Sequence, residues 1–207
     1  RKRSSAASDV YKRQIKTLTV GATTAFIGSG FTKLEAQEVS NQLKGNINHS
    51  VCQWCYPDLS LEELCEVAKE FGLMGIDLIG PSGWDTLKKH KLVSTMCNGA
   101  EISLTEGFND PQYHPVLIEN YIKHIKLVAE AGFTNLICFS GNKRGIDNET
   151  GLHNCVKGLQ QILPLAEELG VVIQMELFNS KIDHPDYMCD NSCLLYTSQS
   201  PRDQAKS

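Results

Sequence analysis

One acidic residue inside an apolar stretch is the feature of this sequence most suited to chemistry. Glu176 stands within the run VVIQMELF, with aliphatic residues on both sides. An ionised carboxylate in such surroundings is unfavourable unless it is paired or bound to a metal ion. Titratable groups of this kind often mark catalytic sites, although a structural carboxylate paired with Arg144 or Lys143 is the alternative. Glu176 is therefore the candidate catalytic residue.

Five further polar or aromatic residues lie where apolar runs end or loops begin. His49 and Trp54 are expected after a first strand, Asn98 after a third, Arg144 in the loop after a fourth, and His184 in the loop after a fifth. We expect them to contact a substrate: His49 and Trp54 would frame it, Asn98 would hydrogen-bond it, and Arg144 would hold a carboxylate. The alternatives are a half-buried structural histidine at 49, a solvated loop charge at 144 and ordinary loop polarity at 184.

The motif CQWC at Cys52 to Cys55 is a weak signal for redox or zinc chemistry. The segment YPDLS separates the pair from the next expected helix, and no second CxxC completes a zinc site. Other cysteines fall at apolar positions of periodic segments and are expected to be buried small hydrophobes. They are Cys65, Cys97, Cys138 and Cys155.

Regular elements are expected from Gly45 onward. Apolar runs predict strands over 46–56, 74–80, 92–99, 134–141 and 171–180. Helical periodicity predicts helices over 61–71, 84–91, 115–131 and 150–169. The first helix carries a capping box, with Ser60 as its N-cap and Glu63 three positions later.

The alternation of these elements predicts an α/β fold. The strands are continuously apolar and separated by helices, as in a parallel sheet buried on both faces. The pattern is that of about five βα units of an incomplete (β/α)8 TIM barrel with disordered or irregular ends; a whole barrel would need roughly 80 to 100 further residues. A doubly wound sheet is the alternative, although no GxGxxG turn supports it.

The two ends of the chain are related to each other as nucleotide sequences. Residues 9–14, DVYKRQ, can be encoded by GATGTGTATAAGAGACAG, and the reverse complement of this string, read one base in, encodes CLLYTS, residues 193–198. Such an inverted repeat resembles the transposon end used to prepare sequencing libraries. We therefore interpret residues 1–14 and 193–207 as adapter-derived tails and residues 15–192 as part of a longer protein.

Residues 15–42 resemble a targeting segment. The stretch IKTLTVGATTAFIGSGF is apolar and Gly-rich, too short for a stable membrane span, and followed by polar residues. It is similar to the rear of a bacterial secretory signal and a linker, which predicts a periplasmic or exported protein. A surface helix of a cytoplasmic protein is the alternative. The barrel would then occupy residues 43–192.

Charge limits the class of partner. The chain has 20 basic and 24 acidic residues, and the two tails hold seven of the basic and two of the acidic ones, so residues 15–192 carry about −9. An acidic surface without a basic patch argues against nucleic-acid binding. A small-molecule ligand is expected, and a homo-oligomer is left open.

Four segments together resemble a known family: GNINHSVCQWCY, NGAEISLTEGFNDPQYH, TNLICFSGNKRG and VIQMELFNSKIDHPDYMCD. They are similar to the hydroxypyruvate isomerase group of the xylose-isomerase-like TIM barrels. The resemblance implies that Glu176, in the segment MELFN, binds a divalent metal ion and takes part in proton transfer. It also implies that the remaining ligands come from strands six to eight, so the chain by itself is expected to be inactive.

The activity implied is that of a metal-dependent aldose–ketose isomerase, which converts hydroxypyruvate to tartronate semialdehyde through an enediolate. Such a reaction needs a base beside the substrate and a cation on two oxygens, and Mg²⁺ or Mn²⁺ is the expected ion. The ligand would be a hydroxy-keto acid or a sugar. The alternatives are a sugar epimerase on the same barrel and a non-catalytic sugar-binding protein.

Overall fold

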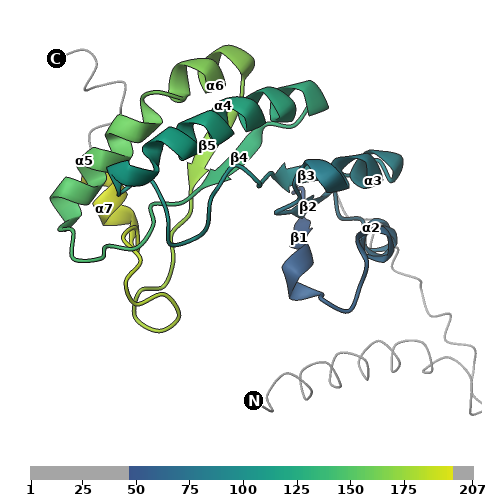
Figure 1. Ribbon diagram of the computed structural model, residues 1–207. Coiled ribbons are helices and arrows are strands. Elements are labelled where there is room, and N and C mark those ends of the chain that lie inside the picture. The colour runs from purple at the N-terminus through teal and green to yellow at the C-terminus, as the bar shows by residue number, and fades with distance from the viewer. Residues whose placement is uncertain (1–46, 198–207) are drawn as a thin grey trace, which may run out of the picture. The chain divides into compact units, whose positions relative to one another are not determined.

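The computed structural model describes residues 47–197, with side chains to residue 194 (Figure 1). The expected tail 1–14, the expected signal remnant 15–42 and residues 198–207 lie outside the described residues. Within the described range, no helix combines the length and the apolar character that crossing a membrane requires.

The described residues form five short strands, and every pairing between these strands is parallel. They are β1 (Ser50–Cys52), β2 (Gly75–Asp77), β3 (Val93–Met96), β4 (Asn135–Cys138) and β5 (Val172–Met175). β1, β2 and β3 form one sheet and β4 and β5 another. A bridge at Cys97 joins the two: its N–H donates to the Asn135 carbonyl at 2.9 Å, and its carbonyl accepts from the Ile137 N–H at 3.0 Å.

The spatial order of the strands follows their order in the chain. A doubly wound sheet reverses its order at a switch point, whereas a barrel adds each strand beside the previous one. No reversal occurs among the five described strands. The connectivity is therefore that of a barrel, although these strands do not close one.

Helices follow the strands as the sequence predicts. They are α2 (Leu61–Glu70), α3 (Trp84–Lys89), α4 (His114–Ala131), α5 (Asn148–Leu159), α6 (Leu163–Leu169) and α7 (Ser192–Thr197). Single 3₁₀ turns precede some of them: η1 (Gln53–Cys55), η2 (Pro81–Gly83) and η3 (Pro111–Tyr113). Figure 1 shows α4 and α6 running beside β4 and β5.

The predicted capping box is present at the start of α2. The Glu63 N–H donates to the Ser60 Oγ at 3.3 Å, and the Ser60 N–H donates to the Glu63 carboxylate at 2.8 Å. Two backbone donors that the helix leaves unpaired are thus satisfied. This fixes where the chain turns from the loop after β1 into α2.

Two predicted elements differ from the structure. The helix expected over 150–169 is wrong as one element, because the chain forms α5 and α6 with a break between them. Pro164 is the second residue of α6, where its missing N–H is harmless, whereas inside a continuous helix it would remove a hydrogen bond and clash with the preceding turn. The irregular end expected from residue 193 is also wrong as far as Thr197, because this stretch belongs to α7 (Ser192–Thr197).

Burial on both faces, predicted for the whole sheet, is found in β4, whereas β1 and β5 are only partly buried. In β4, Leu136 and Cys138 belong to the larger core shared with the helices. Ile137, between them, and Phe139, just beyond the strand, pack on the opposite face against Tyr187. This alternation is the two-residue period of a strand. The cysteines expected in the core are all buried: Cys65, Cys97, Cys138 and Cys155.

Candidate functional site

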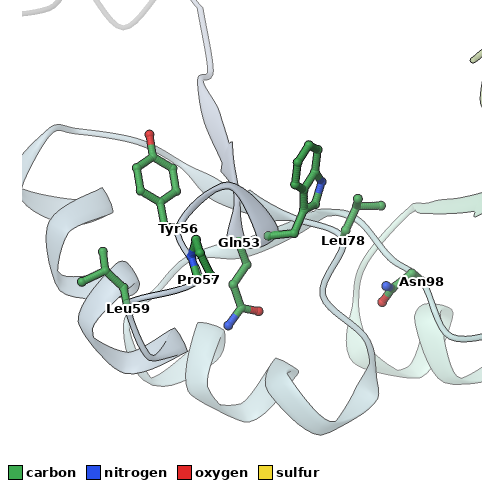
Figure 2. A pocket seen from close by; sticks show the side chains of 7 residues that line it. Gln53, Tyr56, Pro57, Leu59, Leu78 and Asn98 are labelled. Atoms are coloured by element: carbon green, nitrogen blue, oxygen red, sulfur yellow. The ribbon is translucent and has the colours of Figure 1, made fainter. Parts of the chain in front are cut away.

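A pocket of about 370 Å³ lies where β1, β2 and β3 end (Figure 2). Because the strands are parallel, the residues that follow them meet at one edge. Trp54 follows β1, Leu78 follows β2 and Asn98 comes shortly after β3. The pocket is lined by Gln53, Trp54, Tyr56, Pro57, Leu59, Leu78 and Asn98.

The side chains that line this pocket suit a small ring-shaped ligand with polar groups. Trp54 is 71% exposed and offers an aromatic face, while Gln53 and Asn98 offer amide donors and acceptors. Pockets that combine aromatic surface with a few polar groups bind small ligands and fix their orientation. The structure thus brings Trp54 and Asn98, two predicted substrate contacts, to one pocket.

Asp77 ends β2 and links the three neighbouring strands. Its carboxylate accepts from the Ser50 hydroxyl, with 3.0 Å to each oxygen, and from the Thr95 hydroxyl. Sequence reasoning missed Ser50 and Thr95, because their contact with Asp77 depends on strand register. These hydrogen bonds hold the end of β2 directly before the pocket residue Leu78. The backbone of Leu78 has a φ of 60°, which lies in the left-handed region.

Glu176 is the first residue after β5. Its backbone N–H donates to the Cys138 carbonyl at 3.0 Å, which extends the ladder from β4. The carboxylate is half-buried and makes no hydrogen bond or ion pair with any described residue. Burial raises the pKa of Glu176, and the nearby charge of His184 opposes that rise. A partly desolvated carboxylate with a raised pKa suits a proton-transferring group.

His184 lies in the loop after β5, close enough to Glu176 for its charge to act on the carboxylate. The His184 N–H donates to the Asn179 carbonyl at 3.0 Å, and its ring stacks on Phe178 with 4.4 Å between centroids. The ring is half-buried, so its orientation is restrained. Glu176 and His184 therefore form a second group of predicted site residues.

Tyr187 was missed by the sequence argument. Its hydroxyl accepts from the Ser140 N–H and donates to the Glu176 carbonyl, both at 3.0 Å, and burial raises its pKa. The residue thus ties the end of β4 to the end of β5. The available sequence signal was the apolar triplet YMC inside an otherwise polar loop.

The Arg144 guanidinium contacts side chains of the protein itself. Its guanidinium donates to the Tyr113 hydroxyl at 2.9 Å and lies 3.6 Å from a Glu106 carboxylate oxygen. Its backbone N–H donates to the Asp186 carboxylate at 3.0 Å. Among the described residues, none of its contacts involves Glu176, so the alternative pairing of these two residues is not formed.

The expected placement of His49 after the first strand is wrong. His49 precedes β1 and is exposed, and its carbonyl accepts from the Met74 N–H at 2.8 Å at the amino end of the ladder. The strand is shorter than its apolar run suggested because the residues before Ser50 are mostly polar and the partner strand begins only at Gly75. That His49 contacts a substrate remains a prediction, and His49 is not among the residues that line the pocket.

The described residues do not form a metal site by themselves. Within residues 47–197, no three histidine, cysteine, aspartate or glutamate side chains are grouped so as to hold an ion. Glu176 and His184 supply one oxygen and one imidazole donor, fewer than the three protein ligands of typical catalytic zinc sites. A metal ion at Glu176 would need ligands from outside these residues.

Comparison with solved structures identifies the fold. The IolI protein with a bound zinc atom superposes with a TM-score of 0.60 at 14% identity, over 78% of this chain and 60% of that one. An AP endonuclease of family 2 from Brucella melitensis gives 0.54 at 15%, over 73% and 64%. D-psicose 3-epimerase from Clostridium cellulolyticum H10, with D-tagatose, gives 0.52 at 13%, over 67% and 55%.

These neighbours are xylose-isomerase-like TIM-barrel proteins, and likeness at such identities concerns the fold. The chain spans 55% to 64% of the length of these three structures. No family model matches the sequence, and no curated protein matches it.

Proposed function

We propose that the chain forms the first part of a sugar-processing isomerase or epimerase barrel in which Glu176 transfers the proton. The observation that carries this proposal is the state of the Glu176 carboxylate. It is half-buried at the carboxyl end of β5 and has no hydrogen-bond partner among the described residues. A structural carboxylate at such a place would be paired, because burial without a partner is unfavourable.

The chemistry follows from that carboxylate. Glu176 removes the proton from the hydroxyl-bearing carbon beside the substrate carbonyl, which leaves an enediolate, and then returns the proton to the former carbonyl carbon, while the hydroxyl proton passes from one oxygen to the other. The raised pKa of Glu176 makes it a better proton acceptor than an ordinary carboxylate. His184 lies near enough to favour the ionised form when its ring is charged.

A divalent cation such as Mg²⁺ or Mn²⁺ would supply charge for the two oxygens of the enediolate. The described residues do not complete a site for it. We propose that a longer chain contributes the missing ligands, because the structures that this chain matches are longer than it is.

Hydroxypyruvate is the proposed substrate, with conversion to tartronate semialdehyde. Its carboxylate needs a cationic or amide partner at the pocket, and Asn98 offers an amide there. The pocket residue Trp54 would pack against the carbon skeleton. No lysine or arginine lines this pocket.

A sugar epimerase is the second candidate, and the state of Arg144 favours it. This guanidinium is held by Tyr113 and Glu106, which leaves it less able to bind a substrate carboxylate. A neutral ketose needs no such cation. The aromatic face and amides of the pocket match the apolar faces and hydroxyl groups of a sugar.

Substrate profiling of the complete protein tests these alternatives. The protein is incubated with Mn²⁺ and either hydroxypyruvate or D-tagatose, and the products are followed by NMR. Tartronate semialdehyde from hydroxypyruvate supports the isomerase, and a 3-epimer of the ketose supports the epimerase. Saturable binding of D-tagatose without turnover of either compound would show a non-catalytic sugar-binding protein and contradict the proposed reaction.

A further inference from the structure

We propose that Cys52 and Cys55 form a reversible disulfide by exchange with a low-molecular-weight disulfide, and that this bond changes the pocket that contains Gln53 and Trp54. The bond does not depend on the proposed isomerase reaction. The pair therefore constitutes an oxidative modification site at the edge of the sheet.

The backbone brings the two cysteines together. β1 ends at Cys52, and η1 continues directly from Gln53 to Cys55. In a 3₁₀ turn, residues three positions apart lie over one another, and a disulfide requires Cα atoms about 4.4 to 6.8 Å apart. Both cysteines are free, and charge on Cys55 contributes to the raised pKa of Cys52, as expected of neighbouring thiols.

This arrangement differs from what the sequence suggested. The segment between the pair and α2 argued against a redox motif, because redox CxxC pairs usually begin a helix. In the structure the pair has a short helix of its own, η1, with Cys52 as the N-cap and Cys55 as the last residue. The distance to α2 is therefore irrelevant to the contact between the thiols.

Exposure decides which thiol reacts first. Cys55 is exposed and Cys52 is half-buried, whereas Cys138, Cys155 and Cys189 are buried. Cys193 is the other exposed cysteine among those described, and it has no cysteine three positions away. An oxidant in solution therefore reaches Cys55 and Cys193, and Cys55 has Cys52 three positions away to complete an exchange.

The exchange proceeds in two balanced steps. The Cys55 thiolate attacks one sulfur of oxidised glutathione, which forms a mixed disulfide and releases one glutathione thiolate. The Cys52 thiolate then attacks the Cys55 sulfur, which closes the protein disulfide and releases the second glutathione. The protein loses two electrons and two protons, and one glutathione disulfide becomes two thiols.

Cys52 controls the rate of closure. Burial, together with the nearby charges of Cys55 and Asp77, raises the pKa of Cys52 to about 11. The thiolate fraction of Cys52, and with it the second step, should therefore rise about tenfold for each unit of pH below that value. The mixed disulfide at Cys55 should accumulate at neutral pH and close faster in mildly alkaline solution.

The disulfide would affect the pocket because two of the pocket residues lie within the ring of backbone that the disulfide closes. Gln53 and Trp54 stand between the two cysteines in the sequence, and Tyr56 follows directly. A covalent link across this turn restricts the backbone of both enclosed residues. The indole of Trp54 then lies close to a disulfide, which quenches its fluorescence.

The test uses the reduced chain and oxidised glutathione. Free thiols are trapped by alkylation at intervals, and disulfides are located by peptide mass spectrometry without reduction. We expect an internal Cys52–Cys55 disulfide, with Cys193 carrying only glutathione. In Cys52→Ser the glutathione should remain on Cys55, and in Cys55→Ser position 52 should stay reduced.

Tryptophan fluorescence reports the effect on the pocket. The chain has two tryptophans, and Trp84 is buried while Trp54 is exposed. Oxidation should quench the wild-type chain but not Trp54→Phe, which retains Trp84. Glutathione that stays on Cys55 as it does on Cys193 even in mildly alkaline solution, or a disulfide between two chains in place of the internal one, would overturn the proposal. An internal disulfide with unchanged Trp54 fluorescence would overturn its effect on the pocket.

Discussion

The Tyr187 hydroxyl donates a hydrogen bond of 3.0 Å to the backbone carbonyl of Glu176. The same hydroxyl accepts from the Ser140 N–H at 3.0 Å, so one side chain holds the ends of β4 and β5 together. Glu176 is thus positioned through its main chain, and its carboxylate remains without a hydrogen bond among the described residues. A carboxylate held in this way can meet a substrate without first losing a protein partner.

Tyr187→Phe should lower the free energy of unfolding by about 1 to 3 kcal/mol, because the change leaves a buried N–H without its acceptor. Urea denaturation measures the loss. Tyr113→Phe is the matched control, since the Tyr113 hydroxyl bonds to the partly exposed Arg144. Its effect should stay within about 0.5 kcal/mol. Equal losses in the two variants would contradict the role assigned to Tyr187.

Glu176→Gln should stabilise the fold at neutral pH. The pKa of Glu176 is raised by burial, so its protonated form is favoured in the folded state. The stability that it contributes is present below the unfolded pKa and is lost as the pH rises through the folded pKa. The gain should be below about 1 kcal/mol, because solvent screens a half-exposed carboxylate. Urea denaturation at acidic and neutral pH checks it, and a gain equally large at both would contradict the assignment.

Ser60→Ala should lower the free energy of unfolding by about 1 kcal/mol, because α2 loses its N-cap. Hydrogen bonds from Ser60 lower the pKa of Glu63, so this carboxylate stabilises the fold above its unfolded pKa and less as the pH falls through the folded pKa. The difference between wild type and variant should therefore shrink in acid. Ser60→Thr is the control and should retain most of the stability. Thermal unfolding of the three proteins at two pH values checks both expectations.

Gly132→Ala should lower the free energy of unfolding by about 1 to 2 kcal/mol through backbone conformation alone. Gly132 ends α4 with φ of 79°, and an added Cβ would meet nothing within 4 Å. Steric contact is therefore not a cause. Gly132→Asn should lose less, because asparagine tolerates the left-handed region better. An alanine variant as stable as wild type in urea would show that this turn adapts.

The order of strands and helices could be predicted from the sequence because each element carries a local signal. The capping box at Ser60 and the glycines that end α4 and α6 are such signals. Pro164 is the local signal for the break between α5 and α6, since its missing N–H is tolerated at the start of a helix and not inside one.

The rest of the site depends on tertiary contacts that have no local signature. Tyr187 lies in a loop and is buried only because that loop folds back over Ile137 and Phe139. The position of His49 depends on where β2 begins to pair. Trp54 and Asn98 could be placed at one edge, since parallel strands bring their carboxyl ends together.

Proton exchange with solvent tests the central claim most directly. The complete protein is incubated with Mn²⁺ and substrate in D₂O, and deuterium at the carbon beside the carbonyl is followed by NMR. If Glu176 takes the proton, the wild type incorporates deuterium and Glu176→Gln loses at least about a hundredfold in rate. The exposed Glu168→Gln should match the wild type. Undiminished exchange in folded Glu176→Gln would contradict the account.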